Sequence, residues 1–315
     1  MAKTAKIVRE AVLEPSRLPW PGLFHLSVLY VVWGSTYLAI RVAVGPGGGF
    51  PPFSLGAVRV LTAGAVLLAV CRVLGKQILP SAREAATMAV SGVLLWVGGN
   101  GLVLLAERTA DSGYAALLIA AAPMWVAAVE AVADRRLPSP LLIGSMLVGM
   151  GGIAVLSAPS LDGGGADLAA VLCLLGAGLC WALGLVLQQR RPVTLSPVVS
   201  AGWQQLFGAS GFAVVAVLSG EPTPDPSVHA WWALGYLIVF GSLLAFTSFV
   251  IAVRTLPSSV VMTYPYVNPV IAVALGWMLL GEEVTAWTFA GAALVLVAVA
   301  GVFRDRMRRS HLITQ

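Results

Sequence analysis

The sequence predicts an all-α polytopic membrane protein with ten transmembrane helices, arranged as two inverted five-helix repeats. Of its 315 residues, 58% are hydrophobic and only 10% are charged, whereas soluble globular chains carry about 25% charged residues. A helix needs about 20 mostly apolar residues to cross a bilayer. Ten such runs cover residues 22–44, 53–72, 85–105, 112–132, 140–157, 167–187, 198–218, 230–252, 259–280 and 285–303.

A repeated pattern divides these runs into two sets of five. The pattern Ala-x-Arg-Thr-x-x-Ser occurs at residues 106–112 and again at 252–258, and the mid-span Pro123 returns as Pro269. Both offsets are 146 residues (252 minus 106, and 269 minus 123). Two copies of a unit with an odd number of spans must face opposite ways across the bilayer, which is a common architecture of secondary transporters.

The positions of the Lys and Arg residues predict the orientation. If the N-terminus is cytoplasmic, the cytoplasmic segments hold 16 Lys and Arg residues and the outside loops hold only Arg108. Basic loops stay on the cytoplasmic side, so both termini are expected there. The predicted organisation is a cytoplasmic N-terminal segment (1–21), a first repeat (22–157), a linker (158–166), a second repeat (167–304) and a cytoplasmic tail (305–315).

The composition and the missing motifs argue against several classes of function. The pI is near 9.4, but the basic residues lie in short loops and offer no continuous face to a nucleic acid. The sequence contains no G-x-x-x-x-G-K-[ST], H-E-x-x-H or G-x-S-x-G motif, and its three histidines and three cysteines show no metal-binding spacing. We therefore expect no enzyme, metal, cofactor or nucleic-acid partner. The expected partners are a small-molecule substrate and the lipid bilayer.

Polar residues within the predicted spans are the first candidates for a substrate site, because they are costly to bury in a membrane. Arg59 lies in the second span, which contains no acidic residue. Arg59 either extends toward the outer interface or faces a cavity, where it pairs with a carboxylate-bearing substrate or with Glu107. Gln204, in the seventh span, lies near the repeat counterpart of Arg59 and is predicted to orient polar groups of the substrate.

Two aromatic–amide pairs have a spacing of four residues. These are Trp96 with Asn100 in the third span and Tyr264 with Asn268 in the ninth, and each pair is expected on one face of its helix. An amide both donates and accepts hydrogen bonds, so Asn100 is predicted to bind substrate or to link two helices. For Asn268, directly before Pro269, repair of a broken helix is the favoured interpretation.

Deep aromatic residues and prolines are predicted to shape the midplane. Trp33 and Tyr37 share a helix face and, with Trp96 and Tyr264, are expected to line a cavity, although a single deep aromatic residue more often packs the bundle. Three mid-span prolines are predicted to break their helices and act as gates or hinges, with passive kinks as the alternative. These prolines are Pro123, Pro265 and Pro269.

The acidic residues near the spans are candidates for a coupling proton. Glu107 is expected at the outer end of the third span and Glu130 near the inner end of the fourth. A raised pKa would suit either carboxyl to carry a proton, but Glu130 is more simply explained by pairing with Arg135 or Arg136. A coupling proton, or none, and the oligomeric state are left open.

Several segments, in this order and spacing, resemble the EamA family of the drug/metabolite transporter superfamily. The resembling segments are Trp33–Arg41, Pro52–Arg59, Gly99–Glu107, Ser112–Pro123, Tyr264–Val270 and Leu275–Thr285. The resemblance implies ten helices in two inverted halves, cytoplasmic termini and export of small metabolites through a central cavity. An acidic residue commonly follows the fourth span in this family, but Asp134–Leu137 departs from that pattern, whereas Glu282 and Glu283 keep it in the second half.

Together these observations predict a multi-pass secondary transporter of a bacterial-type inner membrane. It is expected to export small amphipathic metabolites, above all amino acids including aromatic and hydrophobic ones, by alternating access through a central cavity. Arg59 would hold a carboxylate, Asn100 and Gln204 would orient polar groups, and the aromatic residues would contact the apolar side chain. The alternatives are an exporter of drugs or other metabolites, or a passive facilitator of the same fold.

Overall fold

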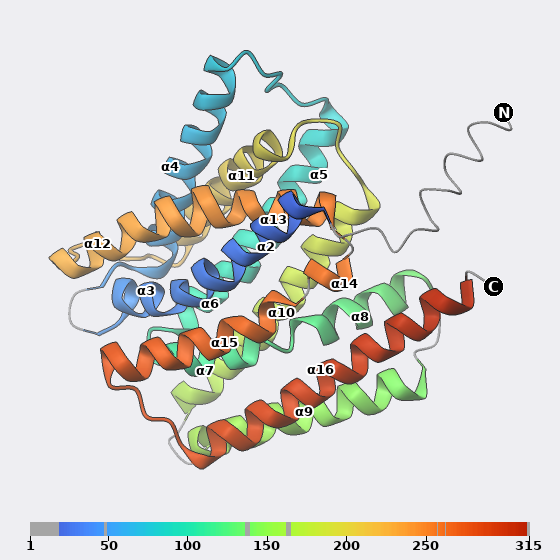
Figure 1. Cartoon of the computed structure of the whole chain (residues 1–315). Coiled ribbons are helices and arrows are strands. Elements are labelled where there is room, and N and C mark those ends of the chain that lie inside the picture. The colour runs from blue at the N-terminus through green and yellow to red at the C-terminus, as the bar shows by residue number, and fades with distance from the viewer. Residues whose placement is uncertain are drawn as a thin grey trace, which may run out of the picture.

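The computed structural model describes residues 19–46, 49–135, 139–161, 165–256, 258–261 and 263–313. These residues form ten helical runs joined by short loops, and no strand occurs among them (Figure 1). The all-α prediction is therefore confirmed. The predicted N-terminal segment lies almost entirely outside the described residues.

The five runs of the first half match the predicted spans within a few residues. Three of these runs are built from more than one segment, and η denotes a π-helical segment. In order they are α2 (Trp20–Val28), η1 (Leu29–Trp33) and α3 (Gly34–Val44); α4 (Pro52–Val73); α5 (Ala82–Gly92), η2 (Val93–Gly101) and α6 (Leu102–Ala106); α7 (Ser112–Ile119) and α8 (Ala122–Ala133); and α9 (Pro140–Leu161).

The second half has the same organisation. In order its runs are α10 (Gly165–Arg190); α11 (Pro197–Leu218); α12 (Val228–Tyr236), η3 (Leu237–Ala245) and α13 (Phe246–Thr255); α14 (Ser258–Val261), α15 (Tyr264–Leu275) and η4 (Gly276–Leu280); and α16 (Ala286–Ile313). Because α9 continues to Leu161 and α10 begins at Gly165, both helices extend into the predicted linker (158–166), of which residues 162–164 lie outside the described residues. Helix α16 likewise extends through most of the predicted tail.

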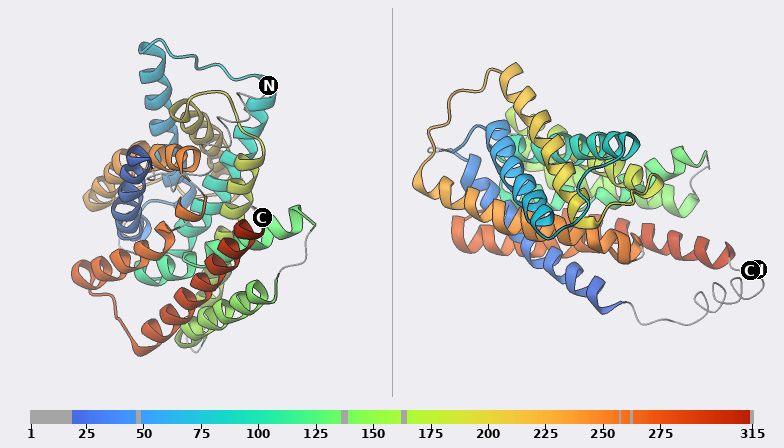
Figure 2. Two further views of the ribbon diagram at one scale, coloured as in Figure 1. Left: turned by 45° about the vertical axis from the view of Figure 1, so that its right-hand side comes forward. Right: turned by 90° about the horizontal axis from the view of Figure 1, so that it is seen from above.

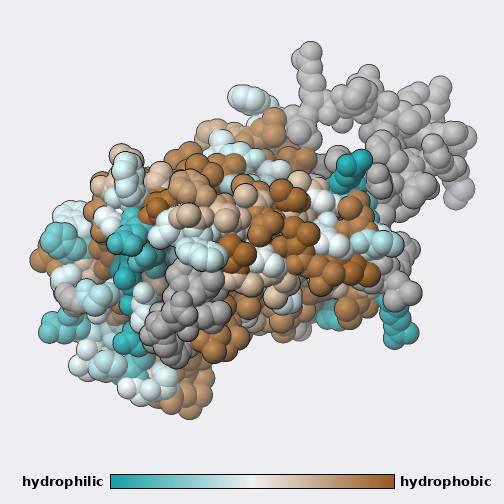
Figure 3. All heavy atoms as spheres, turned by 90° about the horizontal axis from the view of Figure 1, so that it is seen from below, coloured by the Kyte–Doolittle hydropathy of each residue, from teal (hydrophilic) through white to brown (hydrophobic). Residues whose placement is uncertain are grey.

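The surface is that of a protein in a bilayer. Among the described residues, seven runs are long and apolar enough to cross a membrane, and three shorter apolar stretches lie in the fifth, ninth and tenth runs. On the face in Figure 3, apolar side chains fill the middle and hydrophilic ones gather toward the ends. Large apolar side chains are exposed on α9 and α16: Ile143, Leu147, Val148, Met150, Trp287, Phe289, Leu294, Leu296 and Val297.

The two halves pack through helices at matching positions. Helix α4 packs along α11, the second run of each half, and α9 packs along α16, the fifth run of each half. These two pairs lie at opposite edges of the bundle (Figures 1 and 2). Glycine permits the close approach of α4 and α11, because a Cβ atom on Gly64 would lie 2.8 Å from the carbonyl oxygen of Gly202. This pairing of equivalent helices is what two inverted repeats produce.

The fourth and ninth runs are interrupted, but not at matching residues. The fourth breaks at Ala120 and Ala121, and α8 then starts with Pro123 in its first turn. The ninth restarts at Tyr264 with Pro265 in the first turn of α15. Pro269 lies inside α15, so the expectation that it breaks the helix is wrong. It is the sixth residue of α15, so its missing N–H leaves only the Pro265 carbonyl without its helical partner.

Carboxylates and helix N-termini define one end of the bundle. Glu221 accepts hydrogen bonds from the backbone N–H groups of Phe53 (2.8 Å) and Ser54 (2.7 Å). Glu282 accepts them from the N–H groups of Ser112 (2.9 Å) and Gly113 (3.1 Å). The loops after α3, α6, α11 and η4 meet here, and we call this end the Glu221 face.

The other end of the bundle is held by a different set of contacts. Glu84 accepts hydrogen bonds from the N–H (2.8 Å) and hydroxyl (2.7 Å) of Thr194. Arg254 donates to the carbonyl oxygen of Leu195 (2.6 Å) and to Ser200 Oγ (2.8 Å). We call this end, where the loops after α4, α8, α10 and α13 meet, the Arg254 face. Within each half, successive loops alternate between the two faces, so the runs cross the bundle from one face to the other.

Candidate functional site

A small cavity of about 60 Å³ lies at the middle of the bundle, between the two faces. Five of the seven predicted substrate-binding residues line it, namely Trp33, Tyr37, Arg59, Asn100 and Tyr264. The remaining lining residues are Thr36, Ile40, Gly99, Val103, Ile119, Ala177, Trp181 and Asn268. Residues from both halves therefore meet at one point, as the repeat predicts.

Arg59 is the polar centre of this cavity. It is 2% exposed, its Nε donates to Ser242 Oγ (2.8 Å), and its Nη1 donates to Asn100 Oδ1 (3.0 Å). These contacts exclude the interpretation in which Arg59 extends to the outer interface. The expected pairing of Arg59 with Glu107 is also wrong, because no ion pair between Arg59 and a carboxylate occurs within the described ranges.

Three π-helical segments place the residues around Arg59. Trp33 ends η1, Asn100 lies in η2, and Ser242 lies in η3. The indole Nε1 of Trp33 also donates to the carbonyl oxygen of Gly241 in η3 (3.4 Å). A π-helical turn carries an extra residue and is frequent at functional sites. The convergence of three such segments around Arg59 therefore indicates a functional site at this level of the bundle.

The aromatic rings of Trp33, Tyr37, Trp181 and Tyr264 line the cavity, and Phe249 packs behind them without lining it. The ring of Trp33 lies 5.0 Å from Tyr264, 5.2 Å from Phe249 and 5.5 Å from Trp181, measured between centroids. Such distances are typical of favourable edge-to-face and tilted aromatic pairs. The predicted set lacks Trp181, although the sequence holds a signal for it, since Trp181-Ala182 echoes Trp33-Gly34 in the second half.

Trp96 supports Arg59 from outside the cavity. The guanidinium carbon of Arg59 lies 5.3 Å from the Trp96 ring centroid, and Trp96 packs on Phe246 at 4.8 Å. Trp96 is not among the residues that line the cavity. Trp96 therefore positions the arginine through a cation–π contact, whereas Asn100 both binds Arg59 and faces the cavity.

Gln204 lies apart from this cavity. Its Nε2 donates to Ser91 Oγ (3.0 Å), and it lines a separate cavity of about 450 Å³ at the Arg254 face. The expectation that Gln204 shares a site with Arg59 is wrong. The residue with the exact repeat offset from Arg59 is Gln205, which is buried and donates to the carbonyl oxygen of Ala201 in its own helix.

The side-chain amide of Asn268 donates hydrogen bonds to backbone carbonyl groups. With its amide nitrogen turned toward its acceptors, Asn268 donates to the carbonyl oxygens of Leu29 (3.3 Å), Tyr30 (3.1 Å) and Tyr264 (3.1 Å). Two of these carbonyls belong to η1. None of these acceptors is the Pro265 carbonyl that Pro269 leaves free, so Asn268 links α15 to the first run rather than repairing the helix at Pro269, and it also lines the central cavity.

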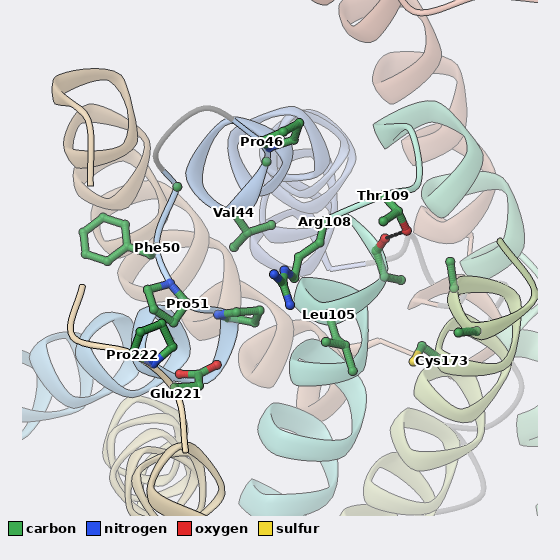
Figure 4. Close-up of a pocket in the computed structure, with 16 residues that line it drawn as sticks. Val44, Pro46, Phe50, Pro51, Leu105, Arg108, Thr109, Cys173, Glu221 and Pro222 are labelled. Atoms are coloured by element: carbon green, nitrogen blue, oxygen red, sulfur yellow. Dashed lines mark hydrogen bonds between the residues drawn. The ribbon is translucent and has the colours of Figure 1, made fainter. Parts of the chain in front are cut away.

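Two larger cavities lie on either side of the central one. The cavity at the Glu221 face measures about 720 Å³ and contains Arg108, Cys173 and Glu221 (Figure 4). The cavity at the Arg254 face measures about 450 Å³. Helix α10 lines all three cavities in order, through Cys173, then Ala177 and Trp181, then Gln188. The three cavities thus follow one path across the bundle.

The carboxyl groups named as proton carriers do not line the central cavity. Glu107 is fully buried directly after α6, and neither of its carboxylate oxygens has a hydrogen-bond partner among the described residues. Glu130 lies in α8, toward the Arg254 face. Within the described part of the chain, no group of three or more His, Cys, Asp and Glu residues could hold a metal ion.

A family model and several related proteins match nearly the whole chain. The family model described as the EamA-like transporter family matches residues 20–158 and 168–304. The Uncharacterized inner membrane transporter YedA of Escherichia coli (strain K12) is 34% identical over 278 residues, covering 87% of this chain and 88% of YedA. Protein PecM of Dickeya dadantii (strain 3937) is 26% identical over 286 residues, covering 88% of this chain and 92% of PecM.

A solved crystal structure shares the architecture. It superimposes with a TM-score of 0.65 at 21% sequence identity, covering 89% of this chain and 95% of the other. At this level of identity the likeness shows a common fold.

Proposed function

The chain belongs to the EamA-like transporter family and is a multi-pass membrane transporter, and we propose that it carries small amphipathic metabolites, above all amino acids with aromatic or hydrophobic side chains. We assign it to a bacterial-type inner membrane, as the name of YedA says of that relative. We further propose that both termini are cytoplasmic and that the physiological direction is export.

The observation that carries this proposal is that Arg59 is buried and forms no ion pair with a carboxylate among the described residues. A buried cation without an acidic partner is costly, and among the described residues Arg59 donates hydrogen bonds to neutral groups, the Ser242 hydroxyl and the Asn100 amide. A guanidinium offers five donors, so it retains N–H groups for a ligand. A substrate carboxylate would supply the missing negative charge through charge-assisted hydrogen bonds.

The aromatic wall supports the second part of the substrate description. The ring of Trp33 lies 5.0–5.5 Å from the rings of Tyr264, Phe249 and Trp181, of which Trp181 and Tyr264 line the cavity with it. Such a wall is suited to an apolar or aromatic side chain, while Arg59 binds the polar end of the same molecule. This combination of one charged group and an apolar wall is common in small-molecule sites.

The sizes of the three cavities support alternating access. Ligand sites commonly measure about 300–1,000 Å³, so the central cavity of about 60 Å³ must widen to accept a metabolite. We propose that the repeats 22–157 and 167–304 move against each other to widen it toward one face at a time, with Pro123, Pro265 and Pro269 as hinges. Exporters of drugs and passive facilitators remain alternative functions for the same fold.

Counterflow in proteoliposomes tests the proposal. Labelled phenylalanine is offered to vesicles with or without unlabelled phenylalanine inside, and 2-phenylethylamine, which lacks the carboxylate, serves as a competitor. We expect preloading to accelerate uptake, because only an alternating carrier shows trans-acceleration, and we expect the amine to compete weakly. Uptake that preloading leaves unchanged would instead indicate a passive facilitator.

Substitution of Arg59 is the sharpest variant for this assay. Arg59→Ala is expected to lower phenylalanine kcat/KM by at least about tenfold, since a hydrogen bond to a charged group contributes about 1.5–3 kcal/mol. Arg72→Ala, an exposed residue in the last turn of the same helix, is the matched control. Folded Arg59→Ala protein that transports phenylalanine like the control would contradict the proposed role.

A further inference from the structure

The two cavities at the ends of the path contain arginines at equivalent repeat positions. Arg108 lines the cavity at the Glu221 face, and Arg254 lines the cavity at the Arg254 face. They are separated by the repeat offset of 146 residues, 254 minus 108. Because the halves are inverted, one position in the repeat has placed a guanidinium in each access cavity.

Arg108 is available to a ligand in its cavity. Its side chain is exposed, and Figure 4 shows the guanidinium extending into the cavity on the side of Pro51. The neighbouring Glu221 does not need it as a counter-ion, because that carboxylate accepts three hydrogen bonds from Phe53 and Ser54 at the N-terminus of α4. Within the described ranges, no carboxylate forms an ion pair with Arg108.

Arg254 is similar in charge but more firmly placed. Two of its nitrogens donate to neutral oxygens, the carbonyl of Leu195 and the hydroxyl of Ser200. Glu84, in the first turn of α5 at this face, accepts hydrogen bonds from Thr194 and Ser81. No ion pair involving Arg254 occurs in the part of the chain that the structure describes. Glu221 and Glu84 are therefore satisfied by uncharged groups, and among the described residues neither Arg108 nor Arg254 forms an ion pair with a carboxylate.

The spacing along α10 relates these arginines to Arg59. Cys173 borders the Arg108 cavity, Ala177 and Trp181 border the Arg59 cavity, and Gln188 borders the Arg254 cavity. At 1.5 Å per residue, the first and last of these positions are about 22 Å apart, and neighbouring cavities are separated by about 6 and 10 Å along the helix. A small carboxylate can pass between such positions in short steps.

We propose that Arg108 and Arg254 are paired access sites for the substrate carboxylate, one at each face, and that Arg59 receives the carboxylate between them. This inference rests on the proposed function. A carboxylate loses its hydration when it enters an apolar bundle, and a guanidinium at each entrance offsets that loss. Because the same repeat position supplies both arginines, each one acts only on substrate that enters or leaves through its own face.

The experiment compares the two directions of transport in one preparation. Proteoliposomes with the protein in a single, verified orientation are used to measure KM for labelled phenylalanine from each side, and 2-phenylethylamine is tested in the same vesicles. Arg254→Gln is expected to raise the phenylalanine KM about tenfold from the Arg254 face only, and Arg108→Gln from the Glu221 face only. Arg72→Gln, which lines none of the three cavities, is the control.

The amine separates recognition from a structural effect. If Arg254→Gln raises KM equally for phenylalanine and for the amine, or equally from both faces, its contacts with Leu195 and Ser200 are structural and the inference is overturned. Unchanged KM values in both variants also overturn it. Failure of the proposed function looks different, because the wild-type protein would then show no saturable phenylalanine transport from either side.

Discussion

The Glu221 face and the Arg254 face tie the two halves together with contacts of different kinds. At the Glu221 face, two carboxylates of the second half, Glu221 and Glu282, bind the N-termini of α4 and α7 in the first half. At the Arg254 face, Glu84 binds Thr194, and Asp134 pairs with Arg190 at 2.6 Å. Three of these four contacts use a carboxylate on backbone N–H groups, and the fourth is an exposed ion pair. At the Arg254 face the indole Nε1 of Trp203 also donates to the carbonyl oxygen of Ile78 (2.7 Å), and the Ser139 hydroxyl donates to Asp305.

This difference follows from one departure in the repeat. Residue 136, the counterpart of Glu282, is an arginine, so the Arg254 face lacks the carboxylate that would match Glu282. A carboxylate at a helix N-terminus satisfies unpaired N–H groups and interacts favourably with the helix dipole. An exposed ion pair contributes little in water. The Glu221 face is therefore expected to be the more firmly closed of the two.

The two faces also differ in a buried titratable group. Glu107 is buried near the Glu221 face, whereas its repeat counterpart is the uncharged Val253. Burial raises the pKa of the Glu107 carboxyl well above its usual range, and the nearby Glu282 raises it further. Arg41 opposes this effect only in part, since it donates to the Glu107 backbone carbonyl (2.7 Å). The firmly tied face thus also holds a buried carboxyl whose pKa is raised.

The largest expected effect comes from removing Glu282. Glu282→Ala leaves the N–H groups of Ser112 and Gly113 without their acceptor and should cost the closed Glu221 face about 3 kcal/mol. The native Cys173, which lines the cavity at that face, reports the change. In a Cys71→Ala, Cys180→Ala background, we expect faster alkylation of Cys173 by a membrane-impermeant maleimide. Glu283→Ala, at the exposed neighbouring residue, should alkylate like the parent, and equal rates in all three proteins would refute the difference in closure.

The effect of pH on Glu107 is expected to be intermediate. A carboxyl whose pKa is higher in the folded protein binds more protons there than in the unfolded chain, so stability falls as pH rises above about 4.3. Glu107→Gln keeps the neutral form and should remove this loss. Thermal unfolding measured from pH 5 to pH 9 should therefore show the variant gaining stability relative to wild type as pH rises. Parallel pH profiles would show that Glu107 is not a buried neutral carboxyl.

The smallest effect is expected at the ion pair of the Arg254 face. The side chains of Arg190 and Asp134 are 42% and 47% exposed, and such pairs contribute about 0–1 kcal/mol. Asp134→Ala should therefore shift the unfolding temperature by no more than a few degrees, and less in high salt. A loss as large as that of Glu282→Ala would mean that the two faces are closed equally.

Hydrophobic runs, the repeat and basic loops were sufficient to predict the helices, because each depends only on composition along the chain. Arg59 was predictable because an arginine within an apolar span has few favourable positions. The positions of Trp96 and Gln204 relative to the central cavity could not be predicted from the sequence. The π-helical segment η2 changes which residues share a helix face, and the spacing of residues in the sequence does not predict this segment. Gln204 lies nearer the Arg254 face than Arg59 does, and this depth in the bundle is determined by how α11 packs on its neighbours.

The break in the ninth run shows the same limit. Pro123 and Pro269 match in the repeat, yet Pro265 opens the α-helix after the break and Pro269 lies within that helix. A proline predicts a missing hydrogen bond, but its cost depends on its distance from the helix start. That distance is set by where the preceding turn ends, which the sequence repeat does not determine.

The central claim, that the two faces open alternately around Arg59, is tested most directly by measuring the accessibility of both end cavities in one protein. Cys173 reports on the Glu221 face, and Thr87→Cys, in the background without Cys71 and Cys180, reports on the Arg254 face. Alkylation rates of both thiols are measured while phenylalanine and the Glu282→Ala substitution shift the conformation. Alternating access predicts that every condition that speeds one reaction slows the other. Two thiols that become accessible together would indicate a continuous channel and contradict the account.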